Sequence, residues 1–233
     1  MAGKDFAFDE ITKVIADLWN PLTADQRELL NEFMVVRRYK KGELVYSERE
    51  KPEWLMCVLE GKIKIYRDGV GGRSQIMRMV KRGEYFAYRA YFAGECYVTT
   101  AAAFEPSTLC SIPMKIIDQL VGANNELAFY FIRKLAYDLG KADERTVNLT
   151  QKHIRGRLAE SLLFLKDSYG LEEDKATIGI YLSREDLANL SNMTTANAIR
   201  TLSNFASERI IAIDGRKIKI IDEEALKRIS KLG

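Results

Sequence analysis

The spacing of hydrophobic and polar positions changes twice along the chain. In residues 1–35 the spacing is helical. A first helix carries Ile11, Val14, Ile15 and Leu18, and Thr23 is placed to cap a second helix. Residues 35–112 instead consist of short runs rich in Val, Ile, Tyr and Phe, separated by glycines. This region predicts an antiparallel β-roll or barrel of the double-stranded β-helix or jelly-roll kind.

A long helix is predicted at about 126–149, after a shorter one near 116–121. Its apolar stripe advances in alternating steps of four and three residues and comprises Ala128, Ile132, Leu135, Leu139, Ala142, Thr146 and Leu149. A repeat of about 3.5 residues is typical of the contact surface of a two-stranded coiled coil. The alternative is that the helix packs this stripe onto its own β domain. Because the stripe follows a complete β domain, we predict a homodimer.

Residues 151–233 form the second of two predicted domains, the first being residues 1–150. The pattern predicts a helix at 154–169 and a strand at 177–182, followed by two short helices and a hairpin. The expected fold class is therefore α+β. It combines an N-terminal antiparallel β-roll with flanking helices, a long dimerisation helix and a C-terminal winged helix-turn-helix.

Residues 182–211 carry the strongest functional signal. A helix at 184–190, for which Ser183 is the N-cap, is followed by a break and a second helix that Thr194 caps. One apolar contact between these helices is expected from Leu187, Ala188, Leu190, Ala198, Leu202 and Phe205. The pattern is that of a helix-turn-helix, whose second helix enters the major groove of DNA.

The outward face of that second helix is suited to nucleic acid. No acidic residue occurs between Asp186 and Glu208, although the chain is otherwise rich in them. The face offers Thr195, Asn197, Arg200 and Asn204, and we assign base reading to Thr195, Asn197 and Arg200.

A β-hairpin follows, in which Asp214-Gly215-Arg216-Lys217 joins two β-branched runs. Its basic tip makes a winged helix-turn-helix the natural interpretation, with an ordinary solvated hairpin as the alternative. A second cluster of Lys152, His153, Arg155 and Arg157 opens the helix at 154–169, where cations oppose the helix dipole. We therefore predict phosphate contacts from Lys152, Arg155, Thr194, Arg216 and Lys217, against the alternative of a hydrated charged surface.

Composition narrows the function classes. The net charge is +3, from 36 Lys plus Arg and 33 Asp plus Glu, so a nucleic-acid surface has to be local. One His and three scattered Cys offer no clustered metal site, and Gly69-Val70-Gly71-Gly72-Arg73 suits a hairpin turn better than a phosphate loop. Charges near the N-terminus interrupt any signal-peptide core, and no run is long enough to span a membrane. We expect a cytoplasmic protein that is not an enzyme.

Several motifs in order resemble the Crp/Fnr family of bacterial transcription regulators. They are Lys41-Gly42-Glu43-Leu44-Val45, Leu59-Glu60-Gly61-Lys62-Ile63, Gly83-Glu84-Tyr85-Phe86, Arg157-Leu158-Ala159 and Leu182-Ser183-Arg184-Glu185-Asp186-Leu187-Ala188. The resemblance implies a homodimer on a two-fold symmetric DNA site, an effector in the N-terminal roll, and RNA polymerase as a partner. The resemblance also implies a DNA sequence different from the common family site, because the family usually has a Glu near the start of the second helix and this chain has Ala196 there. An Ala196 methyl can pack on a thymine methyl.

Other departures concern the effector. Cyclic-nucleotide-binding members carry a Gly-Glu pair and an Arg-Ser pair, which this chain replaces with Ala87-Tyr88 and with residues of Tyr97-Val98-Thr99-Thr100. An anionic phosphate buried without its guanidinium is costly, so cAMP binding in the family manner is not expected. The N-terminal cysteines of iron–sulfur members are also missing, so no cluster is predicted, and His153 does not support haem. Aromatic residues suggest an apolar pocket or a filled core, and the candidate effector residues are Tyr85, Tyr88, Arg89, Tyr97 and Thr99.

Two alternatives to a transcription regulator stay open at this point. One is a cupin-like enzyme on a similar roll, which the lack of clustered metal ligands disfavours. The other is a cyclic-nucleotide-binding signalling module whose C-terminal domain contacts protein.

Overall fold

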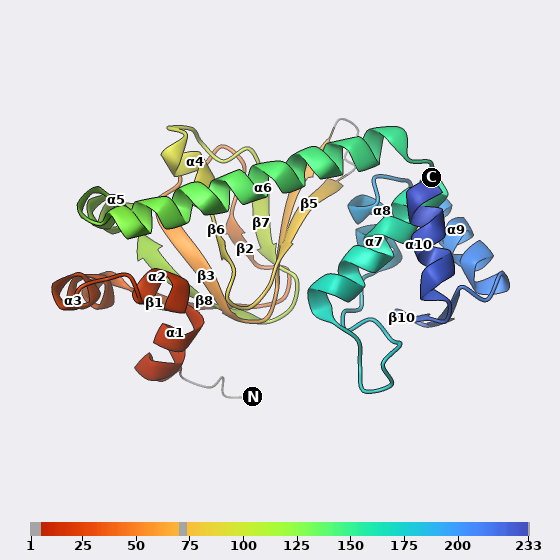
Figure 1. The fold of residues 1–233 in the computed structure, drawn as a ribbon, viewed down its shortest axis with the longest axis horizontal. Helices are drawn as coiled ribbons and strands as arrows, with labels where there is room; N and C mark the ends of the chain where they lie inside the picture. The colour runs from red at the N-terminus through yellow and green to blue at the C-terminus, as the bar shows by residue number, and fades with distance from the viewer. Residues whose placement is uncertain (1–5, 70–73, 233) are drawn as a thin grey trace. The chain divides into compact units, whose positions relative to one another are not determined.

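A computed structural model describes residues 6–69 and 74–232. Two compact units are present, Met1–Asp68 with Ile76–Leu139 and Gly69–Gln75 with Gly140–Gly233 (Figure 1). The division falls inside the long helix α6, whereas the sequence predicts a boundary at residue 150. The elements of the first unit are α1 (Phe8–Val14), α2 (Ala16–Trp19), α3 (Ala24–Phe33), β1 (Val35–Tyr39), β2 (Leu44–Tyr46), β3 (Trp54–Glu60), β4 (Ile63–Asp68), β5 (Ser74–Val80), β6 (Tyr85–Phe86), α4 (Arg89–Phe92), β7 (Thr100–Ala103), β8 (Ser107–Pro113), α5 (Met114–Ala123) and the first part of α6 (Asn125–Gln151).

Two four-stranded sheets make the roll, with strand orders β1-β8-β3-β6 and β2-β7-β4-β5. The pairs β1–β8, β3–β8, β3–β6, β2–β7 and β4–β7 are antiparallel. The predicted antiparallel roll is confirmed. Strands β4 and β5 are neighbours, as a hairpin at 69–73 requires, but residues 70–73 of that turn lie outside the described residues.

Alternation along β3 places its side chains in two cores. Leu55, Cys57 and Leu59 belong to a cluster that the helices cover, whereas Met56 and Val58 face the cluster between the two sheets. Both sets are buried, which is why the strand reads as an unbroken apolar run rather than an alternating one.

Helices α1, α2, α3, α5 and the start of α6 cover the sheet that contains β3. Ile15, Leu18, Leu30, Ile117 and Leu127 are fully buried in that cluster. Helix α3 begins at the predicted cap: Thr23 Oγ1 accepts from Gln26 N, and Gln26 Oε1 accepts from Thr23 N.

Two buried thiols lie opposite one another in this core. Cys57 on β3 pairs in register with Cys110 on β8, and both are almost inaccessible. Burial raises the pKa of Cys110 to about 12 and raises the pKa of Cys57 still further, so both stay protonated. Cys96, by contrast, is exposed.

The second unit is mostly helical. Beyond the end of α6 it contains α7 (Ile154–Tyr169), α8 (Arg184–Leu190), α9 (Thr195–Ser207), β9 (Ile211–Asp214), β10 (Lys217–Ile220) and α10 (Glu223–Leu232). The sequence interpretation ended at the hairpin and missed α10, although its Leu226 is completely buried. No helix in the described parts of the chain is both long and apolar enough to cross a membrane.

The strand predicted at 177–182 is wrong as a regular strand. The segment forms only isolated bridges, Leu171↔Ile178 and Thr177↔Lys219. Asp174 takes up the local backbone donors, accepting from Ala176 N (3.0 Å) and Thr177 N (2.8 Å). Ile178, Ile180 and Leu182 are nevertheless buried, so the apolar alternation indicated burial correctly but not pairing.

Gly61, between β3 and β4, is required by a close approach. Its φ is +82°, and an added Cβ would lie 2.8 Å from Ser107 Cα and also overlap Ser107 Oγ. Gly42 has nearly the same φ, +81°, but nothing lies within 4 Å of an added Cβ. The two glycines therefore separate the cost of a left-handed backbone from the cost of a clash.

We expect Gly42→Ala to lower the free energy of unfolding by about 1 kcal/mol, the cost of placing an L side chain at positive φ. Gly61→Ala should lower it by about 3 kcal/mol or more, because the added methyl also displaces packed backbone. Urea denaturation of both variants measures the difference. Equal losses would contradict the close approach at Ser107.

Candidate nucleic-acid interface

Helix α8 begins at the predicted cap. Ser183 Oγ accepts from Asp186 N (3.0 Å) and donates to Asp186 Oδ2 (2.8 Å). The face of α8 that points away from solvent carries Leu187, Ala188 and Leu190, which are all buried. The local sequence alone fixes where α8 starts and which face it buries.

The turn after α8 is anchored from two neighbouring helices. Arg145 of α6 donates to Leu190 O (3.2 Å), the carbonyl at the end of α8, and Ser191 Oγ bonds Ser161 Oγ of α7 at 2.8 Å. Asn192 adopts a φ of +50°, which a short amide side chain tolerates. These anchors hold the turn that leads into α9, and no local sequence pattern predicts a role there for Arg145 or Ser161.

Helix α9 has a buried face and an outward face. Thr194 Oγ1 accepts from Asn197 N (3.2 Å) at its start, as predicted. The buried face comprises Ala198, Thr201, Leu202 and Phe205, and the outward face comprises Thr195, Ala196, Ile199, Arg200, Ser203, Asn204 and Ser207. The predicted apolar contact with α8 is thus made of buried residues.

The three assigned base readers lie in different settings. Thr195 and Arg200 are exposed, whereas Asn197 is half-buried. Asn197 Oδ1 accepts a short hydrogen bond from the Arg200 guanidinium. The Asn197 amide is therefore engaged by Arg200 and orients its guanidinium.

The wing is the β9–β10 hairpin, with Ile213 opposite Ile218. Gly215 at its tip has φ +54°, and its carbonyl accepts from Arg184 at 2.7 Å, which ties the tip to the start of α8. Arg216 is exposed, and Lys217 lies 3.6 Å from Glu172 and over the ring of Tyr181.

The junction cations Lys152 and Arg155 are engaged with carboxylates. Lys152 Nζ lies 2.6 Å from Glu160 Oε2. Burial alone would raise the pKa of Glu160, but hydrogen bonds from Lys152 and Ser230 outweigh it and lower that pKa.

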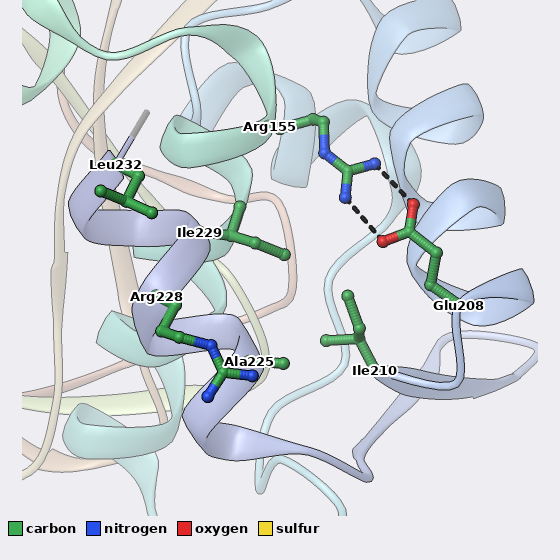
Figure 2. A pocket seen from close by; sticks show the side chains of 7 residues that line it. All are labelled: Arg155, Glu208, Ile210, Ala225, Arg228, Ile229 and Leu232. Carbon is green, nitrogen blue, oxygen red and sulfur yellow. Dashed lines mark hydrogen bonds and ion pairs between the residues drawn. The ribbon is translucent and has the colours of Figure 1, made fainter.

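Arg155 grips Glu208 with two parallel bonds of 2.8 and 2.7 Å, as Figure 2 shows. The pair lies at the rim of a shallow groove whose floor includes Ile210 and Ile229. Either cation can reach a phosphate only by exchanging its carboxylate for it, a competition that a helix-dipole argument does not anticipate.

The candidate effector residues fall into two clusters of the roll. Tyr85 and Tyr88 are buried in the cluster under the helices, whereas Tyr97 stacks on Tyr46 at 3.8 Å between the sheets. Thr99 bonds the Tyr46 hydroxyl (3.3 Å), and Arg89 pairs with Glu95 at the surface (3.3 Å). The structure thus brings Tyr97 and Thr99 together at Tyr46, within reach of the Arg89 charge, and places Tyr85 and Tyr88 in the other cluster.

A charged network that the sequence did not reveal lies between β5 and α6. Asp138 accepts from Arg78 (3.1 Å) and from the Tyr88 hydroxyl (3.4 Å), and Lys134 is 3.8 Å away. Burial, reinforced by the Asp138 charge, raises the pKa of Tyr88, so its hydroxyl remains a donor. The Asp138 carboxylate therefore already pairs with the guanidinium of Arg78.

The predicted dimerisation residues are not equally free. Ile132 and Leu139 are 58% and 64% exposed and Ala142 is exposed, whereas Ala128, Leu135 and Leu149 are half-buried. Leu135 packs against the core under the helices. Phe129, absent from the predicted stripe, is 57% exposed beside Ile132. The free apolar face is thus rotated slightly from the predicted one.

Across residues 6–69 and 74–232, no group of three or more His, Cys, Asp or Glu side chains could hold a metal ion.

Comparison with known proteins agrees with both units. A family model for the cyclic nucleotide-binding domain matches residues 36–124, and one for the Crp-like helix-turn-helix domain matches residues 156–229. The two matches cover the roll and the second unit in the order that the motifs predict.

Individual relatives point the same way. The fumarate and nitrate reduction regulatory protein of Vibrio cholerae is 24% identical over 220 residues, covering 93% of this chain and 88% of that protein. The CRP-like cAMP-activated global transcriptional regulator of Mycobacterium tuberculosis is 24% identical over 191 residues, covering 82% and 85%. The structure of FixK2 from Bradyrhizobium japonicum shares the fold, with a TM-score of 0.76, 21% identity, and coverage of 84% of this chain and 96% of that one. With both domains matched in order and relatives aligned over most of its length, the chain belongs to the Crp/Fnr family of DNA-binding transcription regulators.

Proposed function

We propose that this regulator binds an inverted-repeat DNA site as a homodimer, with α9 in the major groove and the wing on the phosphate backbone. The observation that carries this proposal is the outward face of α9, which is exposed, free of acidic residues and centred on Arg200. Neither a cupin-like enzyme nor a signalling module that contacts only protein requires such a face. Family membership supports the further proposals that the protein controls transcription in the cytoplasm, has RNA polymerase as a partner and is not an enzyme.

Base reading is proposed for Arg200 and, on the first turn of α9, for Thr195, with Asn197 acting through Arg200. A guanidinium donates two hydrogen bonds to guanine O6 and N7, and holding it in one orientation lowers the entropy lost on binding. The bond from Arg200 to Asn197 supplies that orientation.

Phosphate contacts are proposed for Thr194, Arg216 and Lys217, which are all exposed. Lys152 and Arg155 are proposed as conditional contacts, because each must first leave Glu160 or Glu208. An exchange of carboxylate for phosphate costs little where both partners are near solvent.

Dimerisation is proposed through the exposed side of α6, which carries Phe129, Ile132 and Leu139. Large apolar side chains at helical spacing on an exposed face gain free energy when a second helix covers them. Ala128, Leu135, Ala142 and Leu149 flank this face.

The effector is proposed not to be cAMP bound in the manner of the family. Residues 97–100, which replace the family's Arg-Ser pair, supply no guanidinium, and Arg78 is already held by the partly buried Asp138. An iron–sulfur cluster and haem are likewise not proposed. A ligand among Tyr85, Tyr88, Arg89, Tyr97 and Thr99 would have to displace packed aromatic rings.

Arg200→Ala should relax the preference for one guanine in each half-site by about 1–3 kcal/mol. Arg216→Ala should instead weaken all DNA similarly and reduce the salt slope by about one, because it meets phosphate alone. Competition binding with point-substituted sites, taken from random-sequence selection, measures both. If Arg200→Ala weakens every site equally, Arg200 is a phosphate contact.

Leu139→Asp should raise the dimer dissociation constant by about a hundredfold or more, since it buries two like charges in the contact. The matched control is Leu44→Asp, at a leucine that is 53% exposed on β2. Analytical ultracentrifugation should show monomers for the first variant and dimers for the second. A dimeric Leu139→Asp protein would assign the interface elsewhere.

Titration of the full chain with cAMP should give no binding heat at concentrations that saturate a micromolar site. The reason is that residues 97–100 lack the arginine with which cyclic-nucleotide-binding members of the family pair the buried phosphate. Calorimetry makes the measurement, with 5′-AMP as the control nucleotide. A 1:1 complex per subunit with a micromolar Kd would overturn the assignment.

A further inference from the structure

Ile199 is an unexplained apolar residue on the exposed side of α9, between Thr195 and Ser203. Its side chain is 48% exposed, whereas Ala198, Leu202 and Phe205 bury the opposite face almost completely. Folding of the second unit therefore does not need an isoleucine there. Helix geometry places it one turn after Thr195 and Ala196, whereas Arg200 follows it in sequence and points about 100° further round the helix.

Two serines of α9 direct their hydroxyl groups to the backbone of the helix. Ser203 Oγ donates to Ile199 O (3.0 Å), and Ser207 Oγ donates to Asn204 O (2.9 Å). The exposed Thr195 hydroxyl lies one turn before Ile199 and is the hydroxyl proposed for base reading. Ala196 and Ile199 present only methyl groups on the turns that also carry the Arg200 guanidinium.

A base pair shows only one apolar group in the major groove, the 5-methyl of thymine. A half-exposed isoleucine side chain gains free energy by covering that methyl and gains nothing comparable from cytosine, whose edge offers an amino donor. Thymine O4 and the cytosine amino group occupy the same place and both lose water under an apolar side chain, so the methyl contact is what distinguishes the two bases. The chemistry of the face thus selects thymine by contact.

We propose that Ile199 is a specificity-determining residue that recognises a thymine methyl group in each half-site, close to the guanine read by Arg200. This inference rests on the proposed function, because it requires α9 to lie in the major groove. It names the part of the operator that hydrogen bonding alone leaves unspecified: a thymine adjacent to a guanine.

Thymine-to-uracil substitution tests the contact, because it removes the methyl and leaves the base pairing unchanged. The probe is the highest-affinity duplex selected from random DNA with the full chain, resynthesised with one uracil pair per symmetric position. At the position read by Ile199, uracil should weaken binding about threefold to fivefold per half-site, the value of one buried methyl. With Ile199→Ala, the same substitution should have no effect, and Ile199→Val should give an intermediate loss.

The matched control is Ile221→Ala, at an isoleucine that is 52% exposed just after β10. This variant should show the full uracil penalty. The inference is overturned if no thymine in the selected half-site loses affinity on conversion to uracil, or if every penalty persists in Ile199→Ala. Selection of no DNA at all would instead overturn the proposed function, which keeps the two failures distinct.

Discussion

Helix α6 has apolar residues on two opposite faces, and one β-roll can cover only one of them. Leu127 and Phe131 are buried against the roll, while Phe129, Ile132 and Leu139 stay in solvent. A helix that is apolar on both sides needs two partners. The roll is the first, and the proposed second copy is the other. The same helix then continues into the second unit, where Arg145 bonds the end of α8.

The helix-turn-helix derives its rigidity from polar contacts around an apolar joint. Leu190 and Phe205 belong to the joint, and the Ser161–Ser191 and Arg145–Leu190 bonds fix the turn beside it. Buried hydrogen bonds of this kind cost free energy if they are broken, so they hold α9 in one orientation. A fixed orientation is what allows single side chains to select single bases.

Features set by neighbouring residues could be predicted from the sequence, and features set by distant ones could not. The caps at Ser183 and Thr194 and the turn at Gly215 depend on residues within one turn, and they lie where the sequence places them. The strand at 177–182 depended on a partner in the distant hairpin, and it formed only bridges. Arg155 meets Glu208 from far along the chain, which no local pattern indicates. The predicted outward face of α9 omits Ile199, because an apolar residue alone does not indicate whether the fold covers it.

The arrangement of the three cysteines determines how the protein meets oxidants. A thiol reacts as its thiolate, and burial keeps Cys57 and Cys110 protonated although they face each other across two strands. Exposed Cys96 is therefore the thiol that peroxides and alkylating reagents reach first. Thiol oxidation therefore begins at Cys96, for example as a disulfide between two molecules, whereas Cys57 and Cys110 stay unreactive until the roll unfolds.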